Sequence, residues 1–97
     1  MEFDWDENKN QYNFAKHGIA FEEALEIFKT PMLTISDDRY EYGEIREYSI
    51  GAIDFEIVLA VIHTDRSGVT RLISARKANS KERKQYYEYL KKAFGSH

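Results

Sequence analysis

The sequence predicts an α+β fold in which a single antiparallel sheet is packed by two N-terminal helices and a C-terminal helix. Apolar residues recur at helical spacing before Pro31 and again after Ser80, whereas the segment between them alternates or runs apolar as strands do. Ninety-seven residues, 42% of them hydrophobic, suffice for one core. We therefore assign 1–94 to a single domain and 95–97 to a tail or the remnant of a purification tag.

The first third of the chain predicts a short strand followed by two helices. The stretch MEFDWD alternates aromatic and acidic residues, which suits a strand with one buried face. Residues 6–17 have helical spacing, and Gly18 ends this helix because glycine adopts a positive φ without a clash. Pro31 ends the second helix. The polar stripe of the first helix comprises Lys9, Asn13, Lys16 and His17. The apolar face of the second comprises Phe21, Ala24, Leu25 and Phe28.

The middle of the chain predicts four antiparallel strands. MLTIS and REYSIGAI form the first two, separated by the acidic, turn-prone DDRYEYGE. DFEIVLAVIHT is almost wholly apolar, as expected of a central strand covered on both faces. DRSG makes the hairpin turn to VTRLISAR. Alternation along this last strand predicts that Arg71, Ile73 and Ala75 share one face and that Leu72, Ser74 and Arg76 share the other.

The C-terminal segment predicts a helix that begins at Asn79 or Ser80. Glu82 follows Asn79 by three residues, the spacing of a capping box. The inward stripe of this helix comprises Tyr86, Leu90, Ala93 and Phe94. Tyr87 should lie at the edge, where an exposed tyrosine beside lysines suits stacking on an unpaired base. The alternative is that these tyrosines form the rim of a small core.

Positive charge is concentrated near the C-terminus of an acidic chain. The whole chain carries a net charge of -3, yet residues 71–92 hold eight Lys or Arg against two Glu. A local basic field recruits phosphate even when the average is acidic. The strand-to-helix junction therefore predicts a phosphate-binding mouth that comprises Arg76, Lys77, Lys81, Arg83 and Lys84. The alternatives are a solvated helix face and, for Arg71 and Arg76, pairing with carboxylates.

His17 and His63 are the two histidines that suit acid–base chemistry, because histidine gains and loses a proton near neutral pH. Either residue has a structural alternative, the capping of a helix or a strand end. His97 lies in the tail and is excluded. We expect no metal and no cofactor, since the sequence shows no zinc-ligand spacing, Gly-rich phosphate loop or nucleophile elbow. Metal-independent phosphodiester cleavage is the enzymatic reaction that these residue types support.

Composition also limits the cellular setting. The chain has no cysteine, which excludes disulfides and thiolate sites and fits the cytoplasm. The longest apolar run, 57–62, is too short to cross a membrane. The N-terminal MEFDWDEN lacks the basic and apolar regions of a signal peptide. We expect a cytoplasmic protein without membrane contact.

Two long stretches, DWDENKNQYNFAKHGIAFEEALEIF and RLISARKANSKERKQYY, resemble the BrnT family of bacterial toxins. The first is similar to the pattern W-D-x-x-K-x-x-x-N-x-x-K-H-G followed by F-x-E-A, and the second to I-S-A-R-x-A-x-x-x-E-R-x-x-Y. The matching positions are Trp5, Asp6, Lys9, Asn13, Lys16, His17, Gly18, Phe21, Glu23, Ala24, Ile73, Ser74, Ala75, Arg76, Ala78, Glu82, Arg83 and Tyr86. Ala20 departs from the family, where a small hydroxyl residue caps the helix, and this loss should cost stability rather than activity.

The resemblance implies a toxin of a type II toxin–antitoxin pair, with a RelE-like fold, that cleaves RNA without metal and inhibits translation. It implies a BrnA-like antitoxin whose ribbon-helix-helix part binds operator DNA, and a free homodimer or a 2:2 complex. The catalytic residues we expect are His17, Arg71, Arg76, Glu82 and Tyr86. The RNA-binding residues we expect are Lys9, Lys16, Lys77, Lys81, Arg83 and Lys84. The alternatives are a non-catalytic RNA- or protein-binding module and a basic patch that chiefly seats the antitoxin.

Overall fold

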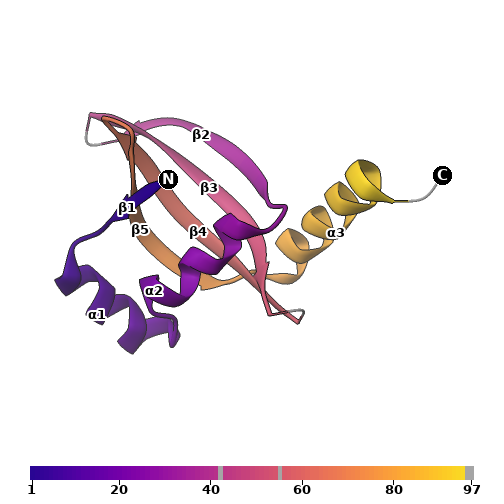
Figure 1. Ribbon diagram of the computed structural model, residues 1–97, viewed down its shortest axis with the longest axis horizontal. Helices are drawn as coiled ribbons and strands as arrows, with labels where there is room; N and C mark the ends of the chain where they lie inside the picture. The colour runs from indigo at the N-terminus through magenta and orange to yellow at the C-terminus, as the bar shows by residue number, and fades with distance from the viewer. Residues whose placement is uncertain (42, 55, 96–97) are drawn as a thin grey trace.

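A mixed sheet with the strand order β1-β5-β4-β3-β2 forms the middle of the molecule (Figure 1). The computed structural model describes residues 1–41, 43–54 and 56–95; the parts of our predictions that fall on Tyr42, Phe55 and residues 96–97 lie outside this range. The strands are β1 (Glu2–Asp4), β2 (Leu33–Glu41), β3 (Glu44–Ile53), β4 (Ile57–Arg66) and β5 (Val69–Lys77). The helices are α1 (Glu7–His17), α2 (Phe21–Ala24), the 3-10 helix η1 (Leu25–Lys29) and α3 (Ser80–Phe94).

The prediction of an α+β fold is confirmed, but the prediction of a wholly antiparallel sheet is wrong. The first strand, β1, runs parallel to β5, with Glu2 opposite Val69 and Asp4 opposite Arg71. Parallel neighbours need a long connection, which the segment between β1 and β5 provides. The second predicted helix also differs, since α2 makes one turn and continues as η1. Its N-cap, Ala20, makes no side-chain capping bond, as its sequence predicted.

The strands around the acidic segment are longer than predicted. We expected DDRYEYGE to be a turn, but β2 continues to Glu41 and β3 begins at Glu44. Pairing between the two strands outweighs the low strand propensity of the acidic residues. Gly43, which precedes β3, takes a φ of 76°. The second hairpin is as predicted, with Ser67 and Gly68 both at positive φ between β4 and β5.

Two apolar clusters lie on opposite faces of the sheet. The helices α2 and η1 cover the face that we call the first face, and its cluster comprises Ile19, Phe21, Ala24, Ile27, Ile53, Leu59, Val61, Leu72 and Ala75. The start of α3 packs on the second face, whose cluster comprises Ile50, Val58, Ala78 and Tyr86. The prediction that Ala93 and Phe94 point inward is wrong, because α3 extends beyond the sheet (Figure 1) and Phe94 is 65% exposed.

A β-bulge in β5 decides which side chains reach the second face. Register passes from Ile62 opposite Ser74 to His63 opposite Leu72, so Ile73 is an extra residue in β5. Leu72 and Ala75 are therefore both buried in the cluster of the first face. Our alternation, which separated Leu72 from Ala75, is wrong. The bulge instead places three polar side chains together on the second face: Arg71, Ser74 and Arg76.

Asn13, which the sequence placed on the polar stripe of the first helix, connects α1 to the edge of the sheet. Its side chain is buried, and its Nδ2 donates to the carbonyl oxygens of Ile19 at 2.9 Å and Ala75 at 2.8 Å. Its Oδ1 accepts from the Ala75 N–H at 3.1 Å. The pairing of β1 with β5 ends at Arg71, so the backbone groups of Ala75 need another partner. Asn13 takes the place of a neighbouring strand there.

Candidate functional site

A cleft of about 500 Å³ opens between α1 and β5. The side chains of Lys9, Lys16 and His17 line it from α1, and Arg71 lines it from β5. These three residues of the polar stripe predicted for the first helix therefore line the same cleft as Arg71. Within the described residues, the lining side chains that could carry positive charge are Lys9, Lys16, His17, Arg46, Arg66 and Arg71.

Two arginines in this cleft were not among our candidates. Arg46 comes from β3 and Arg66 from β4, far from α1 in the sequence. Strand register brings them near Arg71, because Thr64 of β4 lies opposite Arg71 and β3 is the other neighbour of β4. Knowledge of the strand register would have identified these two arginines, but the register cannot be read from a single sequence.

Carboxylates already contact the arginines of the cleft. Arg66 donates from Nε to Glu44 Oε2 at 3.1 Å and from Nη2 to Oε1 at 3.3 Å. The hydrogen bonds from Arg66 lower the pKa of the Glu44 carboxyl below its ordinary value. Arg71 Nη1 lies 3.3 Å from Asp4 Oδ1, in a pair that is partly open to solvent. Pairs of this kind contribute little to stability, so an incoming phosphate can replace the carboxylate at small cost.

His17 is held at the very end of α1. The helix stops there because Gly18 adopts a φ of 73° and donates its N–H to the Phe14 carbonyl oxygen at 2.8 Å. The other end of the helix is fixed by Asp6, whose Oδ1 accepts from the Asn8 N–H at 2.8 Å. These caps, together with Asn13, fix the position of α1, and the half-buried His17 side chain lines the cleft.

A second charged cluster surrounds the start of α3. Arg76 donates from Nη1 to Glu82 Oε1 at 2.7 Å and from Nη2 to Glu82 Oε2 at 2.9 Å. Glu82 Oε1 also accepts from the Asn79 N–H, and Asn79 Oδ1 accepts from the Glu82 N–H, which confirms the predicted capping box. Hydrogen bonds from Arg76 lower the pKa of Glu82, and the bonds to Glu82 raise the pKa of Arg76.

Several predicted phosphate ligands near α3 make contacts within the fold. Arg83 donates to the Ala78 carbonyl oxygen at 3.0 Å and to Ser80 Oγ at 3.2 Å. Tyr86 is buried and donates its hydroxyl to the Pro31 carbonyl oxygen at 3.2 Å, and burial raises its pKa. Arg83 remains exposed despite its bonds, and Lys77, Lys81 and Lys84 are exposed as well.

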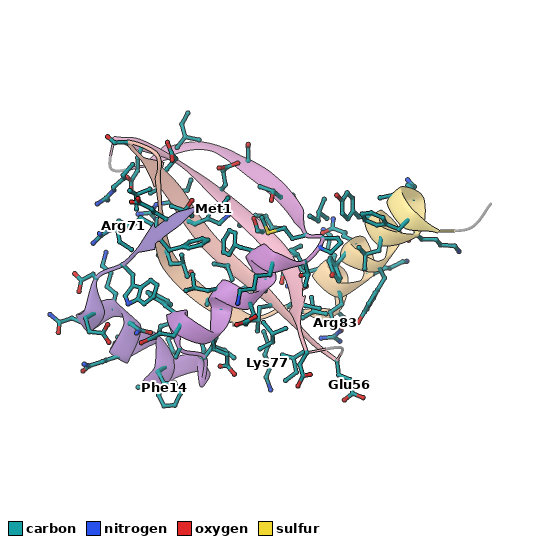
Figure 2. All side chains as sticks on the ribbon, viewed as in Figure 1. Met1, Phe14, Glu56, Arg71, Lys77 and Arg83 are labelled. Atoms are coloured by element: carbon teal, nitrogen blue, oxygen red, sulfur yellow. The ribbon has the colours of Figure 1, made fainter. Side chains whose placement is uncertain are left out.

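The structure divides the predicted catalytic set between these two places. His17 and Arg71 lie in the cleft, whereas Arg76, Glu82 and Tyr86 lie at the α3 end of the sheet. Figure 2 shows the separation, with Arg71 at one end of β5 and Lys77 and Arg83 at the other. Five residues of strand span roughly 16 Å. Because of the bulge, Arg71 and Arg76 nevertheless share the second face.

His63 lies outside both clusters, on the first face. Its Nε2 is 2.8 Å from Ser49 Oγ, which is 2.8 Å from Thr34 Oγ1, and its ring meets the Phe28 ring edge-on at 5.2 Å. Burial lowers the pKa of His63 below its ordinary value, and the nearby Glu47 carboxylate opposes that shift. These contacts fit the structural alternative. In the described part of the chain, no group of three or more histidine or carboxylate side chains is arranged to hold a metal ion, and no helix is long and apolar enough to cross a membrane.

A family model and a solved structure agree on what this chain is similar to. The family model described as "Ribonuclease toxin, BrnT, of type II toxin-antitoxin system" matches residues 5–82. The crystal structure of the Brucella abortus ribonuclease toxin BrnT superposes with a TM-score of 0.61. The two sequences are 29% identical, and the match covers 82% of this chain and 99% of that chain. A search of curated proteins finds no match to the sequence.

Proposed function

Since this chain belongs to the BrnT family of ribonuclease toxins of type II toxin–antitoxin systems, we propose that it cleaves RNA without a metal ion in the cleft between α1 and β5. One observation carries the proposal: the cleft gathers His17, Arg71 and further lysine and arginine side chains from one helix and three strands. A histidine provides a proton acceptor, and clustered cations stabilise the charge that develops on a phosphate under attack.

The reaction that suits these groups uses the nucleophile that RNA itself carries. The ribose 2′ oxygen attacks the adjacent phosphorus while His17 accepts the 2′-hydroxyl proton. The bond from phosphorus to the 5′ oxygen breaks, and that oxygen takes a proton from an ammonium group of the cleft, Lys9 or Lys16. Arg71 faces the phosphoryl oxygens and stabilises the transition state. The products are a 2′,3′-cyclic phosphate and a 5′-hydroxyl end.

The charged cluster around the start of α3 extends the RNA-binding surface in this proposal. Arg71 and Arg76 share the second face, so one RNA strand that runs along β5 meets both. Arg76 contacts phosphate, with Glu82 and Tyr86 as its supports: Glu82 holds the guanidinium with two hydrogen bonds, and Tyr86 anchors α3 to the Pro31 carbonyl. Further phosphates meet Lys77, Lys81, Arg83 and Lys84.

The cellular role follows from the same proposal. Membership in a type II toxin family implies an antitoxin partner. We propose that this partner is a BrnA-like protein with a ribbon-helix-helix part, that it covers the basic surface in a 2:2 complex, and that the complex binds operator DNA only through the antitoxin. In this proposal the toxin acts in the cytoplasm and inhibits translation by cleaving RNA, and its fold belongs with those of RelE-like toxins. The exposed cations of α1 and α3 support a negatively charged covering segment.

The test is cleavage of purified RNA by the antitoxin-free protein in excess EDTA. We expect His17→Ala to lower the rate by about 10²–10⁴-fold, the usual range for loss of an acid–base group, and Arg71→Ala to lower it comparably. Lys29→Ala is the matched control, because Lys29 lies on η1, is not among the residues that line the cleft and pairs with Glu26 on the same helix. Arg76→Ala should weaken RNA binding more than it slows the bound reaction. Product ends are read by whether a phosphatase can remove the terminal phosphate before and after acid opening of the cyclic ester.

The second candidate function is a non-catalytic RNA-binding module, which is favoured by the carboxylates that already contact Arg71 and Arg76. Such a module would bind RNA with the same dependence on Arg71 and leave it intact. A folded parent protein that binds RNA through Arg71 but cuts none, either alone or with translating ribosomes, would support this alternative and refute the ribonuclease proposal.

A further inference from the structure

An exposed tyrosine lies in the wall of the cleft and has no role in the reaction above. Tyr12 belongs to α1, lines the cleft beside Lys9 and Lys16, and is 68% exposed. A side chain this exposed buries little apolar area and adds little to the stability of the fold. It was not among the candidate residues, and the pattern quoted above for the BrnT resemblance leaves its position unspecified.

Helix geometry places the Tyr12 ring between two cations of the cleft. Lys9 precedes Tyr12 by three residues and Lys16 follows it by four, so the three side chains project from one side of α1, about 5–6 Å apart. The Lys16 ammonium lies 5.9 Å from the centroid of the Tyr12 ring. With the ammonium toward one face of an exposed ring, the ring still offers a flat π surface to a planar ligand.

From this arrangement, and resting on the proposed function, we propose that Tyr12 stacks on an unpaired base next to the scissile phosphate and so helps to determine which RNA sequences are cleaved. The lysines on either side bind the phosphates that flank the stacked nucleotide. In a duplex the bases stack on one another, so the substrate class is single-stranded RNA. The strength of stacking increases with the area of the π face. A purine is therefore preferred over a pyrimidine at that position, and both are preferred over an abasic nucleotide.

The chain offers a matched control on the same helix. Phe14 is 57% exposed, but it lies outside the cleft, and Figure 2 shows it pointing away from the side of α1 on which Arg71 lies. Phe14→Ala also removes a largely exposed aromatic side chain from α1, at a position two residues from Tyr12. If cleavage depends on stacking, only Tyr12→Ala should reduce it. If the substitutions act by disturbing α1, both should reduce cleavage.

The experiment combines the tyrosine substitution with removal of the base. Short single-stranded RNAs carry a fixed cleavage site and differ only in the neighbouring nucleotide, which is a purine, a pyrimidine or an abasic ribose. We expect Tyr12→Ala to lower kcat/KM on the purine substrate by about 5- to 150-fold, the range that corresponds to one lost base–aromatic stack. On the abasic substrate it should change nothing. Tyr12→Phe should keep the purine preference, and Phe14→Ala should behave as the parent.

Equal losses on purine and abasic substrates, or no loss on either, would overturn the proposal, because stacking requires both partners. Binding of fully 2′-O-methylated copies of the same RNAs, which 2′-hydroxyl attack cannot cleave, separates this result from failure of the ribonuclease proposal. A parent that cuts no RNA but binds the purine copy tighter than the abasic copy, through Tyr12, supports the stacking role while the proposed reaction fails. A parent that binds neither copy refutes both.

Discussion

Replacing Asn13 by alanine should weaken the attachment of α1 to the sheet and destabilise the fold. Asn13 makes three hydrogen bonds through its buried side chain, two to the backbone of Ala75 and one to the Ile19 carbonyl oxygen. Alanine would leave these three backbone groups without their partner, and each buried polar group that lacks a hydrogen bond costs about 1–3 kcal/mol of stability. Partial entry of water reduces the total, so we expect a loss of about 3–5 kcal/mol. A domain of this size has a stability of about 5–15 kcal/mol, so the variant should fold but be marginal.

The assay for Asn13→Ala is urea unfolding followed by circular dichroism, with Gln11→Ala as an exposed control on the same helix. Hydrogen exchange adds a local readout, since the Ala75 N–H should lose its protection in the variant while the amides of the central strand keep theirs. A loss below about 1 kcal/mol together with a protected Ala75 amide would refute the reasoning, because another group would then be satisfying the edge of β5.

Three further predictions concern stability. Burial lowers the pKa of His63, so the unfolded chain binds a proton at this residue more readily than the folded protein does. The free energy of unfolding should therefore be constant above about pH 6.5 and fall as the pH drops below that value. In His63→Gln, this dependence on pH should be weaker. Gly51→Ala places a Cβ 2.9 Å from Ile27 Cβ, and thermal unfolding should show a loss of about 1–3 kcal/mol. Glu82→Gln weakens the hold on Arg76 and the helix cap, and urea unfolding should show a loss of about 1–2 kcal/mol.

Each of these predictions has a contrary outcome. A pH slope that survives His63→Gln unchanged would assign the proton uptake to another group. A melting temperature unaffected by Gly51→Ala would mean that η1 can move away from β3 freely. Glu88→Gln removes a carboxylate from an exposed position of α3 and is the control for Glu82→Gln. Equal losses in these two variants would reflect the net charge of the helix and not the bonds to Arg76.

Local features of the fold could be predicted from the sequence, because the residues that determine them are adjacent. The cap formed by Asn79 and Glu82 and the helix end at Gly18 each depend on a few consecutive residues. The bulge at Ile73 could not be predicted, since it arises from how β5 pairs with β4. Asn13 looked like a surface residue for the same reason: its partner, Ala75, is 62 residues away.

The candidate site was predictable to a similar extent. The histidine and lysines of the cleft belong to one helix, and their spacing gathers them on one side. Arg46 and Arg66 reach the cleft only through the pairing of strands, and no local pattern indicates which face of the sheet they occupy. The pairing of Arg76 with Glu82 was open in the sequence as an alternative to phosphate binding, and the geometry of the α3 cap shows the contact.

The parallel pairing of β1 with β5 also has a consequence for how the chain acquires its structure during synthesis. Glu2 pairs with Val69, and the cleft is closed on one side by α1 and on the other by β5. A nascent chain can form its early helices and its central hairpins as they emerge, but β1 and α1 have no sheet edge to dock on until β5 has left the ribosome. Contacts between such distant residues form late and slowly. We therefore expect the cleft to be absent from growing chains and to form only when the last strand is in place.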